Sequence, residues 1–357
     1  MYKKPLILGI ESSCDETAAS LVTENEQGSA IVLSNIISSQ VEVHKKFGGV
    51  VPELAARSHI EKIDHIVKKA IDESGKKIEE IDAIASTAGP GLIVCLSVGL
   101  SFGKSLAVSL NKPFIAVNHL EGHALSPKLN SKLNYPYLLL LISGGHSQFL
   151  SVQKLGQYVR LGTTIDDALG EAFDKTAKLL GIEFPGGPQI EILAKKGDPK
   201  KYNLPKPILN RGGCNLSFAG LKTAILKISK NIKTEKEKFD LAASFQKTVE
   251  EILYKKTKNA FSEFEKKNKI VEKKFVVAGG VAANKKIRKM LESLCIEENY
   301  ESIFPPIELC GDNAAMIAVV GLEKFKINKF DTLDHPAKPR WPLDEKASFL
   351  KGAGVKL

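Results

Sequence analysis

Two histidines lie four residues apart in the segment HLEGH, residues 119–123. On a helix, this spacing places His119 and His123 on one face, where both rings can bind a single metal ion. In zinc proteases with the pattern H-E-x-x-H, the glutamate that serves as general base directly follows the first histidine. Here Leu120 has that place, and Glu121 lies two residues after His119, about 200° further round the helix. The pattern therefore permits a metal site but lacks the peptidase base, and two histidines without any metal would show the same spacing.

A metal site of this kind needs a third ligand. Asp312 offers a carboxylate in the segment CGDNAAM, at the entrance of a predicted helix. Two histidines and one aspartate leave coordination positions open, so an ion that they hold could act as a Lewis acid on a substrate oxygen. We therefore expect Asp312 to join the two histidines.

Three turns rich in glycine or hydroxyl residues each follow an apolar strand pattern. They are GIESSCDET at 9–17, LISGGHSQ at 141–148 and VVAGGVAANKKIR at 276–288. Glycine lets the backbone approach an anion, and free N–H groups in such turns can bind phosphate. None of the three fits the Rossmann or P-loop pattern, and each alone could be an ordinary turn. Together they favour a ligand that carries phosphate.

The segment 162–181 predicts a helix with one polar stripe. At helical spacing, Asp174 shares this stripe with Asp167, Glu171 and Lys178, whereas the apolar side consists of Leu169, Phe173, Ala177 and Leu180. One interpretation is a solvated helix face. The other is that Asp174 accepts hydrogen bonds from the hydroxyl groups of a ribose.

The elements that must position these residues alternate between strand and helix. The sequence predicts strands at 5–12, 18–23, 30–37, 82–89, 113–118, 137–143, 149–153 and 274–281. It predicts helices at 52–75, 92–110, 119–123, 167–180, 219–230 and 236–267, another helix that begins near residue 283, and a last helix that ends at residue 325. A hairpin with a polar turn occurs at the start of the chain and again from Tyr137. This weak internal repeat predicts an α/β fold of two similar halves.

The composition is that of a soluble globular protein, with 357 residues, of which 43% are hydrophobic and 26% charged. The five cysteines are scattered and form no C-x-x-C pair, so we expect reduced side chains rather than a zinc or redox site. No apolar run is long enough to span a membrane. The first residues predict a strand rather than a signal or transit peptide, so we expect a cytoplasmic protein.

The net charge of +10 favours a polyanionic partner. Lysines are concentrated at 195–206, 227–238, 255–274 and 285–289. Acidic residues are mixed in, so most of these lysines fit solvated helix faces. Some of them could form a surface that contacts phosphates.

Eight motifs of the chain resemble, in order, those of the TsaD family, the tRNA adenosine threonylcarbamoyltransferases once described as O-sialoglycoprotein endopeptidases. The motifs are GIESSCDETA, HLEGH, LLLISGGHSQ, GEAFDKTAKLLG with PGGP, LSFAGLKTA, VVAGGVAANKKIR, CGDNAAMIA and KPRWPL. The resemblance extends from about Leu6 to Pro342 and points to the bacterial form of the family. It implies the α/β fold of the actin-like, sugar-kinase and Hsp70 (ASKHA) ATPases, with two lobes and a central cleft. On this basis we expect residues 1–118 with 326–357 to form the N-terminal lobe, and residues 119–325 to form the C-terminal lobe with the metal and nucleotide site at the cleft.

The resemblance also implies an activity, the transfer of a threonylcarbamoyl group from threonylcarbamoyl-AMP to N6 of adenosine 37 in tRNAs that read ANN codons, which forms t6A. His119, His123 and Asp312 match the ligands of one divalent metal ion per subunit, for which Fe²⁺ is expected and Zn²⁺ is a plausible substitute. The positions that match substrate-binding residues are Leu141, Ile142, Ser143, Gly144, Gly145, Asp174, Gly187 and Asn284. No further catalytic side chain is assigned. Gln189 leaves a further ribose contact open, while Glu191 keeps the acidic residue that follows.

Family members in bacteria act on tRNA together with a smaller TsaB-like paralogue and a TsaE-like ATPase, and the helix predicted at 52–75 is a candidate surface for the paralogue. No membrane partner is implied. Two other functions remain open at this point. One is a metal-dependent peptidase, which only the HLEGH segment supports; the other is a nucleotide-gated ASKHA scaffold without transferase activity.

Overall fold

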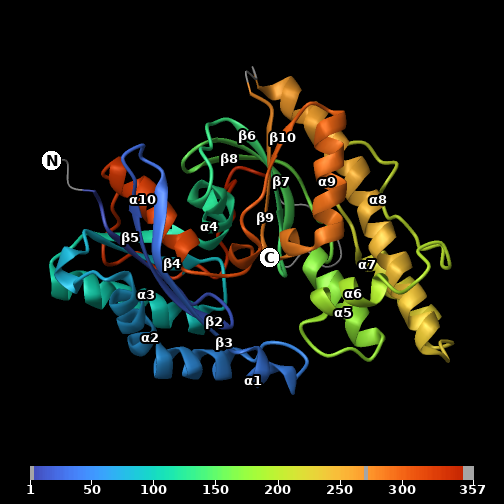
Figure 1. The fold of residues 1–357 in the computed structure, drawn as a ribbon, viewed down its shortest axis with the longest axis horizontal. Coiled ribbons are helices and arrows are strands. Elements are labelled where there is room, and N and C mark those ends of the chain that lie inside the picture. Colours follow the sequence, from blue (N-terminus) through green and yellow to red (C-terminus); the bar gives the residue numbers. More distant parts are fainter. Residues whose placement is uncertain (1–3, 269–271, 349–357) are drawn as a thin grey trace. The chain divides into compact units, whose positions relative to one another are not determined.

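The computed structural model describes residues 4–268 and 272–348, which form two compact units. Among these residues, the first unit contains those up to Asn134 together with Pro305–Glu345. The second contains Tyr135–Phe304 and the residues from Lys346 onward. Each unit contains one five-stranded sheet covered by helices, so the predicted α/β class is confirmed (Figure 1).

The sheet of the first unit has the strand order β3-β2-β1-β4-β5. Its strands are β1 (Ile7–Glu11), β2 (Glu16–Glu24), β3 (Ala30–Ser39), β4 (Ala83–Gly89) and β5 (Phe114–Asn118). The first three strands are antiparallel, whereas β4 and β5 continue the sheet in parallel with β1. The helices of this unit are α1 (Val41–Lys45), α2 (Pro52–Ser74), α3 (Ile93–Leu110), α4 (His119–Leu125) and α10 (Ala315–Lys326), with 3₁₀ turns at Ile78–Glu80, Ser126–Leu129 and Ile307–Leu309.

Side chains of β1 alternate between two helical layers. Leu8 and Ile10 belong to a buried cluster with residues of α2 and α3, including Ile63 and Leu100. Gly9 points to the other face, where a Cβ atom would collide with the first turn of α10. Glu11 has the same parity as Gly9, so the end of β1 presents a carboxylate on the face that α10 covers.

The second unit repeats this topology with the strand order β10-β9-β6-β7-β8. Its strands are β6 (Tyr137–Ile142), β7 (Ser147–Lys154), β8 (Gln157–Thr163), β9 (Lys274–Ala278) and β10 (Glu301–Ile303). Again three consecutive strands form an antiparallel meander, and two later strands join the first of them in parallel. The helices are α5 (Leu169–Leu179), α6 (Gly186–Ala194), α7 (Ala219–Ser229), α8 (Glu235–Lys267) and α9 (Lys285–Glu297), with a 3₁₀ turn at Gly280–Ala283. The duplication inferred from the two hairpins is therefore present in both sheets.

The boundaries between the units differ from those expected from the sequence. The expected lobes divide at 118/119 and 325/326, whereas the compact units divide at 134/135, 304/305 and 345/346. The cause is α10, which packs on β1, β2 and β4 and also contacts α4. Both helices therefore belong to the first unit, and no residue of the HLEGH segment lies in the second.

Contrary to the expectation that no apolar run reaches membrane-spanning length, helix α3 is long and apolar enough to cross a membrane by length and composition, and no other helix of the described residues is. It packs on β4 and α2, and Leu96 and Leu100 are buried in the unit. We therefore interpret α3 as a helix that covers the sheet. Helix α6 was not predicted, because its sequence begins with two glycines and a proline.

Candidate metal centre and nucleotide loops

The helix that carries the two histidines begins directly after β5. The side chain of Asn118 caps it, since Oδ1 accepts hydrogen bonds from the backbone N–H groups of Leu120 at 2.9 Å and Glu121 at 3.4 Å. The short helix brings His119 and His123 to the same side, with their ring centroids 4.8 Å apart. Gly122 lies on the side that faces α10, where a Cβ atom would be 3.0 Å from the Cδ1 atom of Ile317.

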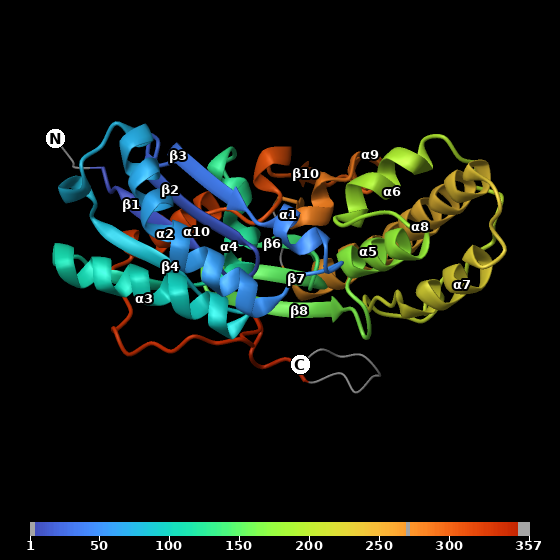
Figure 2. The same cartoon turned by 90° about the horizontal axis from the view of Figure 1, so that it is seen from below.

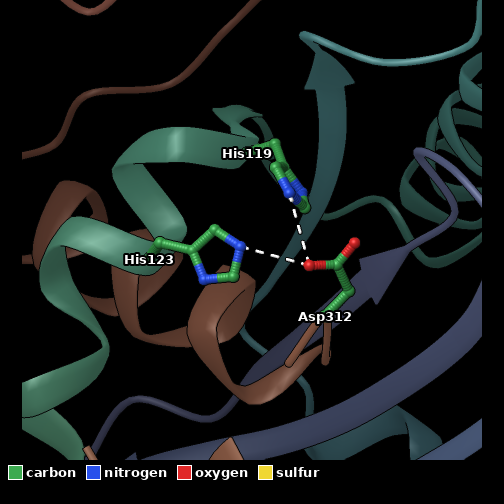
Figure 3. A group of neighbouring side chains, drawn as sticks. All are labelled: His119, His123 and Asp312. Atoms are coloured by element: carbon green, nitrogen blue, oxygen red, sulfur yellow. Dashed lines mark hydrogen bonds and ion pairs between the residues drawn. The ribbon is translucent and has the colours of Figure 1, made fainter. Parts of the chain in front are cut away.

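Asp312 reaches the histidines because α10 lies close to the sheet. Gly9 has no Cβ, so the backbone at Ala314 can pack directly on β1. The helix itself is capped by Asn313, whose Oδ1 accepts a hydrogen bond from the N–H group of Met316 at 3.0 Å. The carboxylate of Asp312 points to the two rings (Figure 3).

The three side chains have the geometry of a metal site. The Oδ1 atom of Asp312 is 3.1 Å from Nε2 of His123 and 3.5 Å from Nε2 of His119. All three candidate ligand atoms lie within 4.8 Å of one another. Because metal–ligand bonds in such sites are about 2.0–2.2 Å long, ligand atoms are typically about 3.0–3.5 Å apart. The donor set therefore fits one ion.

A buried glutamate contacts the ring of His119 at Nδ1, the nitrogen that does not face Asp312. The Oε2 atom of Glu11 is 3.0 Å from Nδ1 of His119 and accepts a hydrogen bond from the Thr87 hydroxyl at 2.6 Å. Its Oε1 atom accepts a hydrogen bond from the N–H group of Ser13 at 2.5 Å. A proton on Nδ1 leaves the lone pair of Nε2 for a metal, which is the usual role of a carboxylate behind a ligand histidine. The Nδ1 atom of His123, in contrast, has no hydrogen-bond partner among the described residues.

Electrostatics around the site favour a cation. Burial alone would lower the pKa of His119, but the Glu11 and Asp312 carboxylates outweigh it and raise that pKa to about 9. Burial together with the charges of Asp312 and Asp15 raises the pKa of Glu16 to about 10. The carboxylates beside His119 therefore attract positive charge.

The remaining acidic residue of HLEGH has a different partner. Glu121 forms a buried ion pair with Lys324 of α10, with Nζ and Oε2 3.2 Å apart. Lys324 also donates a hydrogen bond to the carbonyl oxygen of Ala116 at 3.0 Å. Glu121 therefore links α4 to α10 and is not placed as the general base of a peptidase.

The second unit contains all the positions expected to bind the substrate. In the turn between β6 and β7, the N–H group of Ser143 donates to the carbonyl oxygen of His146 at 2.8 Å. Gly144 and Gly145 form the exposed tip, and a Cβ atom at either would meet nothing within 4 Å. The N-terminus of α5 lies on this turn, because the N–H group of Gly170 donates to the carbonyl oxygen of Ser143 at 3.1 Å. Free N–H groups beside a helix N-terminus are suited to bind an anion.

Hydrogen bonds connect this turn to the other expected positions. On α5, Oδ1 of Asp174 accepts a hydrogen bond from the N–H group of Gly186 at 2.8 Å, which fixes the start of α6 next to Gly187. On α6, Oε1 of Glu191 accepts one from the N–H group of Lys285 at 3.1 Å, at the start of α9. The structure thus brings Asp174, Gly187 and the start of α9 into one group of loops.

Asn284 has structural partners as well as its expected role. Its Oδ1 atom caps α9 by accepting hydrogen bonds from the N–H groups of Lys286 and Ile287 at 3.1 and 3.0 Å. Its Nδ2 atom donates to Oε1 of Gln246 at 3.0 Å. A ligand would therefore meet the second N–H of this amide rather than its oxygen.

Sequence reasoning missed the residues that support His119. Ser13 and Thr87 both contact Glu11, although Thr87 is 76 residues from it. A charged residue at the end of the apolar strand LILGIE is a weak signal of such a role. Buried His59 of α2 was missed too; its ring atoms lie 2.7 Å from the Thr17 hydroxyl and 3.0 Å from the Cys14 carbonyl oxygen, next to the turn that follows Glu11.

Known proteins resemble this chain over its whole length. The sequence profile of the TsaD family, tRNA N6-adenosine threonylcarbamoyltransferase, matches residues 31–319. A protein of that name from Pelagibacter ubique (strain HTCC1062) is 79% identical over 357 residues, which is 100% of both chains. Another from Rickettsia rickettsii (strain Sheila Smith) is 54% identical over 342 residues, which is 95% of this chain and 98% of the relative.

Solved structures of HypF share the fold at low sequence identity. HypF of T. kodakarensis has a TM-score of 0.60 and 14% identity, covering 94% of this chain and 49% of its own. A full-length HypF in a phosphate- and nucleotide-bound form has a TM-score of 0.58 and 16% identity, covering 93% of this chain and 48% of its own. This likeness concerns the fold alone, and with the two like sheets it supports the ASKHA type. Given the sequence relatives, the chain belongs to the TsaD family of tRNA N6-adenosine threonylcarbamoyltransferases, the enzymes that form t6A in tRNA.

Proposed function

We propose that the chain transfers the threonylcarbamoyl group from threonylcarbamoyl-AMP to N6 of adenosine 37 in tRNAs that read ANN codons, and that it does so with one divalent metal ion bound by His119, His123 and Asp312. The observation that carries the metal assignment is the convergence of these three side chains, with Glu11 hydrogen-bonded behind His119. The convergence does not depend on the resemblance to the family.

The reaction joins the exocyclic amine of the adenosine to the carbamoyl carbon of the donor. The bond between that carbon and the phosphate oxygen breaks, AMP leaves, and the amine loses a proton. In this proposal the N–H groups of the 143–145 turn and the N-terminus of α5 bind the phosphate, while Asp174 and Gly187 lie at the ribose. When bound, a divalent ion would supply a Lewis acid for a donor oxygen, where developing negative charge most needs stabilisation.

Fe²⁺ is the metal that we propose, with Zn²⁺ as a substitute. Two imidazole nitrogens and one carboxylate suit either ion and leave coordination positions open for a substrate. Glu11 would keep His119 in the tautomer that binds through Nε2, and Asp312 would supply negative charge next to the ion.

We further propose that the chain works in the cytoplasm with a TsaB-like paralogue and a TsaE-like ATPase. The surface proposed for the paralogue is a groove of about 720 Å³ between α2 and α3, lined by residues that include Ile60, Ile63, Val94 and Val98. Ile60 is 65% exposed and Val94 is 39% exposed. An apolar groove of this kind is typical of a surface that another protein covers.

The test combines transfer and metal content. The purified chain with its two partner proteins, threonylcarbamoyl-AMP and unmodified tRNA should yield modified adenosine by mass spectrometry. Asp312→Ala should lose both transfer and the metal that the parent retains after dialysis. Glu308→Ala is the matched control, because it removes an exposed carboxylate four residues before Asp312 and keeps all three ligands.

Two results would contradict the proposal. Full metal content and normal transfer in Asp312→Ala would mean that another carboxylate holds the ion. Peptide cleavage or ATP hydrolysis by the parent, without any modified adenosine, would favour the peptidase or the scaffold.

A further inference from the structure

Two segments of the second unit carry the positive charge of the chain. Residues 195–238 contain twelve basic and three acidic side chains, a local charge of +9, and residues 255–289 contain the same numbers, whereas the whole chain has a net charge of +10. The residues outside these two segments therefore have a net negative charge. The two segments differ in their ion pairs, because four lysines of the second segment pair with glutamates, namely Lys258, Lys266, Lys273 and Lys274.

The fold gathers most of these residues at one end of α8. Residues 195–201 follow α6 and are fixed to the first turns of α8, since the N–H group of Asp198 donates to Oδ1 of Asp240 at 2.7 Å. Lys196 lies over the ring of Phe239, with Nζ 5.4 Å from the centroid. The end of α7 joins the start of α8 through residues 230–234. We call this surface the basic end; its lysines are Lys195, Lys196, Lys200, Lys201, Lys227, Lys230, Lys233, Lys236 and Lys238. Figure 2 shows α6, α7 and α8, the helices that carry or adjoin these residues.

The acidic residues of the basic end are already engaged. Asp240 pairs with Lys236 at 2.6 Å, and Glu235 pairs with Lys238 at 2.7 Å. Glu237 accepts hydrogen bonds from the N–H groups of Lys233 and Thr234, where it caps α8. Six lysines form no ion pair within the described residues and are exposed; they are Lys195, Lys200, Lys201, Lys227, Lys230 and Lys233.

The basic end is close to the expected substrate loops within the same unit. Helix α6 begins at Gly186, which is hydrogen-bonded to Asp174, and ends at Ala194, directly before Lys195. Its nine residues correspond to a length of about 13 Å. A polyanion bound to the basic end would therefore lie about the length of α6 away from the expected nucleotide position.

We infer that the basic end binds the phosphate backbone of tRNA and holds the substrate against the second unit. This inference rests on tRNA being the substrate, as proposed above. Unpaired lysine ammonium groups gain affinity by releasing the counterions of a nucleic acid, without sequence readout. An anionic membrane is the other polyanion that lysines attract, but a surface helix that binds membranes carries large apolar side chains opposite its lysines. Helix α7 uses Leu221 and Ile225 to pack inside the unit instead.

The experiment compares two triple charge reversals in the full chain. The test variant is Lys200→Glu, Lys227→Glu and Lys230→Glu. The control variant is Lys255→Glu, Lys266→Glu and Lys267→Glu, which changes the net charge equally in the C-terminal half of α8. Affinity for unmodified tRNA is measured at several salt concentrations, together with thermal melting and with transfer in the presence of the partner proteins.

We expect the test variant to bind tRNA at least tenfold more weakly and the magnitude of the slope of log K against log salt to fall by about 2–3, because three phosphate contacts are lost. The control should change affinity less than twofold, and both variants should melt like the parent. Equal weakening in both variants, or none in the test variant, would overturn the inference while parental transfer still supports the proposed function. If the test variant lost binding to phosphatidylserine vesicles but kept the tRNA affinity of the parent, the inference would also be overturned, because the basic end would then bind a membrane. A parent that neither binds nor modifies tRNA would refute the proposed function itself.

Discussion

Two buried glutamates lie beside the helix of the two histidines, and their partners separate their roles. Glu11 contacts Nδ1 of His119, whereas Glu121 pairs with Lys324 on the opposite side of α4. The first can influence the metal through the ring, while the second links α4 to α10. Substitution of each by glutamine keeps the shape and removes the charge, so the two variants form a matched pair.

Glu11→Gln should weaken metal binding without unfolding the protein. The amide can donate to Nδ1 of His119 and so favour the tautomer in which Nε2 carries the proton and cannot bind a metal. Loss of a carboxylate behind a ligand histidine typically costs about 10–100-fold in metal affinity. Zn²⁺ competition with a chelator measures the affinity, and ¹⁵N chemical shifts of the imidazole in the metal-free protein report the tautomer. Unchanged values of both would show that Glu11 only fills space.

Glu121→Gln should instead lower the stability of the protein and leave its metal affinity unchanged. Removing one partner of a buried ion pair costs about 3–5 kcal/mol of stability, because Lys324 keeps its charge without a carboxylate. The melting temperature should therefore fall, whereas the folded protein should bind Zn²⁺ as the parent does and should still modify tRNA. His123→Ala is the contrasting variant, expected to lose both the metal and transfer. A Glu121→Gln protein as inactive as His123→Ala would place this carboxylate in the chemistry after all.

At the scale of single residues, sequence reasoning found the groups that bind directly and missed those that support them. The histidine spacing of HLEGH is a local pattern, so His119 and His123 could be recognised. The partners of Glu11 and of Lys324 come from distant segments, and no local pattern encodes them. Asp312 was found but its surroundings were not, since the cap of α10 is Asn313.

At the scale of elements, the turn between β6 and β7 is built so that its tip faces open space. A Cβ atom at Gly144 would meet nothing within 4 Å, so Gly144→Val should leave the fold intact. The isopropyl group would instead occupy the path of a phosphate to the backbone N–H groups. We expect affinity for AMP to be lost and the melting curve to be unchanged. Gly212→Val is the control, because Gly212 also has open space around its Cβ position and lies outside the group of substrate loops. Unchanged AMP affinity in Gly144→Val would contradict the phosphate role of the turn.

The groove between α2 and α3 makes a second prediction at this scale. Ile60→Glu places a charge in an apolar groove, at a side chain that is 65% exposed in the chain alone. Folding should be unaffected, whereas the complex with the TsaB-like paralogue should be lost in size-exclusion chromatography. Ile296→Glu on α9 is the matched control, since Ile296 is 79% exposed and lies in the second unit. A complex that survives Ile60→Glu would place the paralogue elsewhere.

Most elements could be predicted from periodicity, but α1, α6, β8 and β10 were missed. The helix predicted at 52–75 is α2, Pro52–Ser74, which ends at Gly75 in a left-handed conformation. The strand predicted at 274–281 ends at Ala278, because Gly279 turns the chain with φ of +94°. Helix α6 could not be foreseen from a sequence that begins GGP, and it depends on the tertiary hydrogen bond from Gly186 to Asp174.

At the scale of the whole molecule, the two sheets have the same topology. The strands and helices of the second unit come from one continuous segment, whereas those of the first come from two. The strands and helices of the second unit all lie between Tyr135 and Phe304. The first unit needs two distant segments, because α10 must return to cover Gly9 on β1. The internal repeat could be predicted from the two hairpins. The return of α10 could not, since it depends on small residues that meet only in the folded unit.

Because the strands and helices of the second unit are contiguous in sequence, a fragment can separate the expected substrate positions from the metal ligands. Residues 135–304 contain all eight expected substrate positions and all of β6–β10, but none of the three metal ligands. The isolated fragment should fold cooperatively and bind AMP, and it should not bind Zn²⁺ above the level of Asp312→Ala in the full chain. Circular dichroism melting and calorimetric titration with AMP and with Zn²⁺ measure the three properties. A chain that ends at residue 304 is the complementary variant: it keeps both histidines but lacks Asp312 and α10, so the face of β1 at Gly9 is uncovered and the first unit should not fold. A fragment that binds Zn²⁺ tightly, or that folds without binding AMP, would contradict the assignment of the two ligands to separate units.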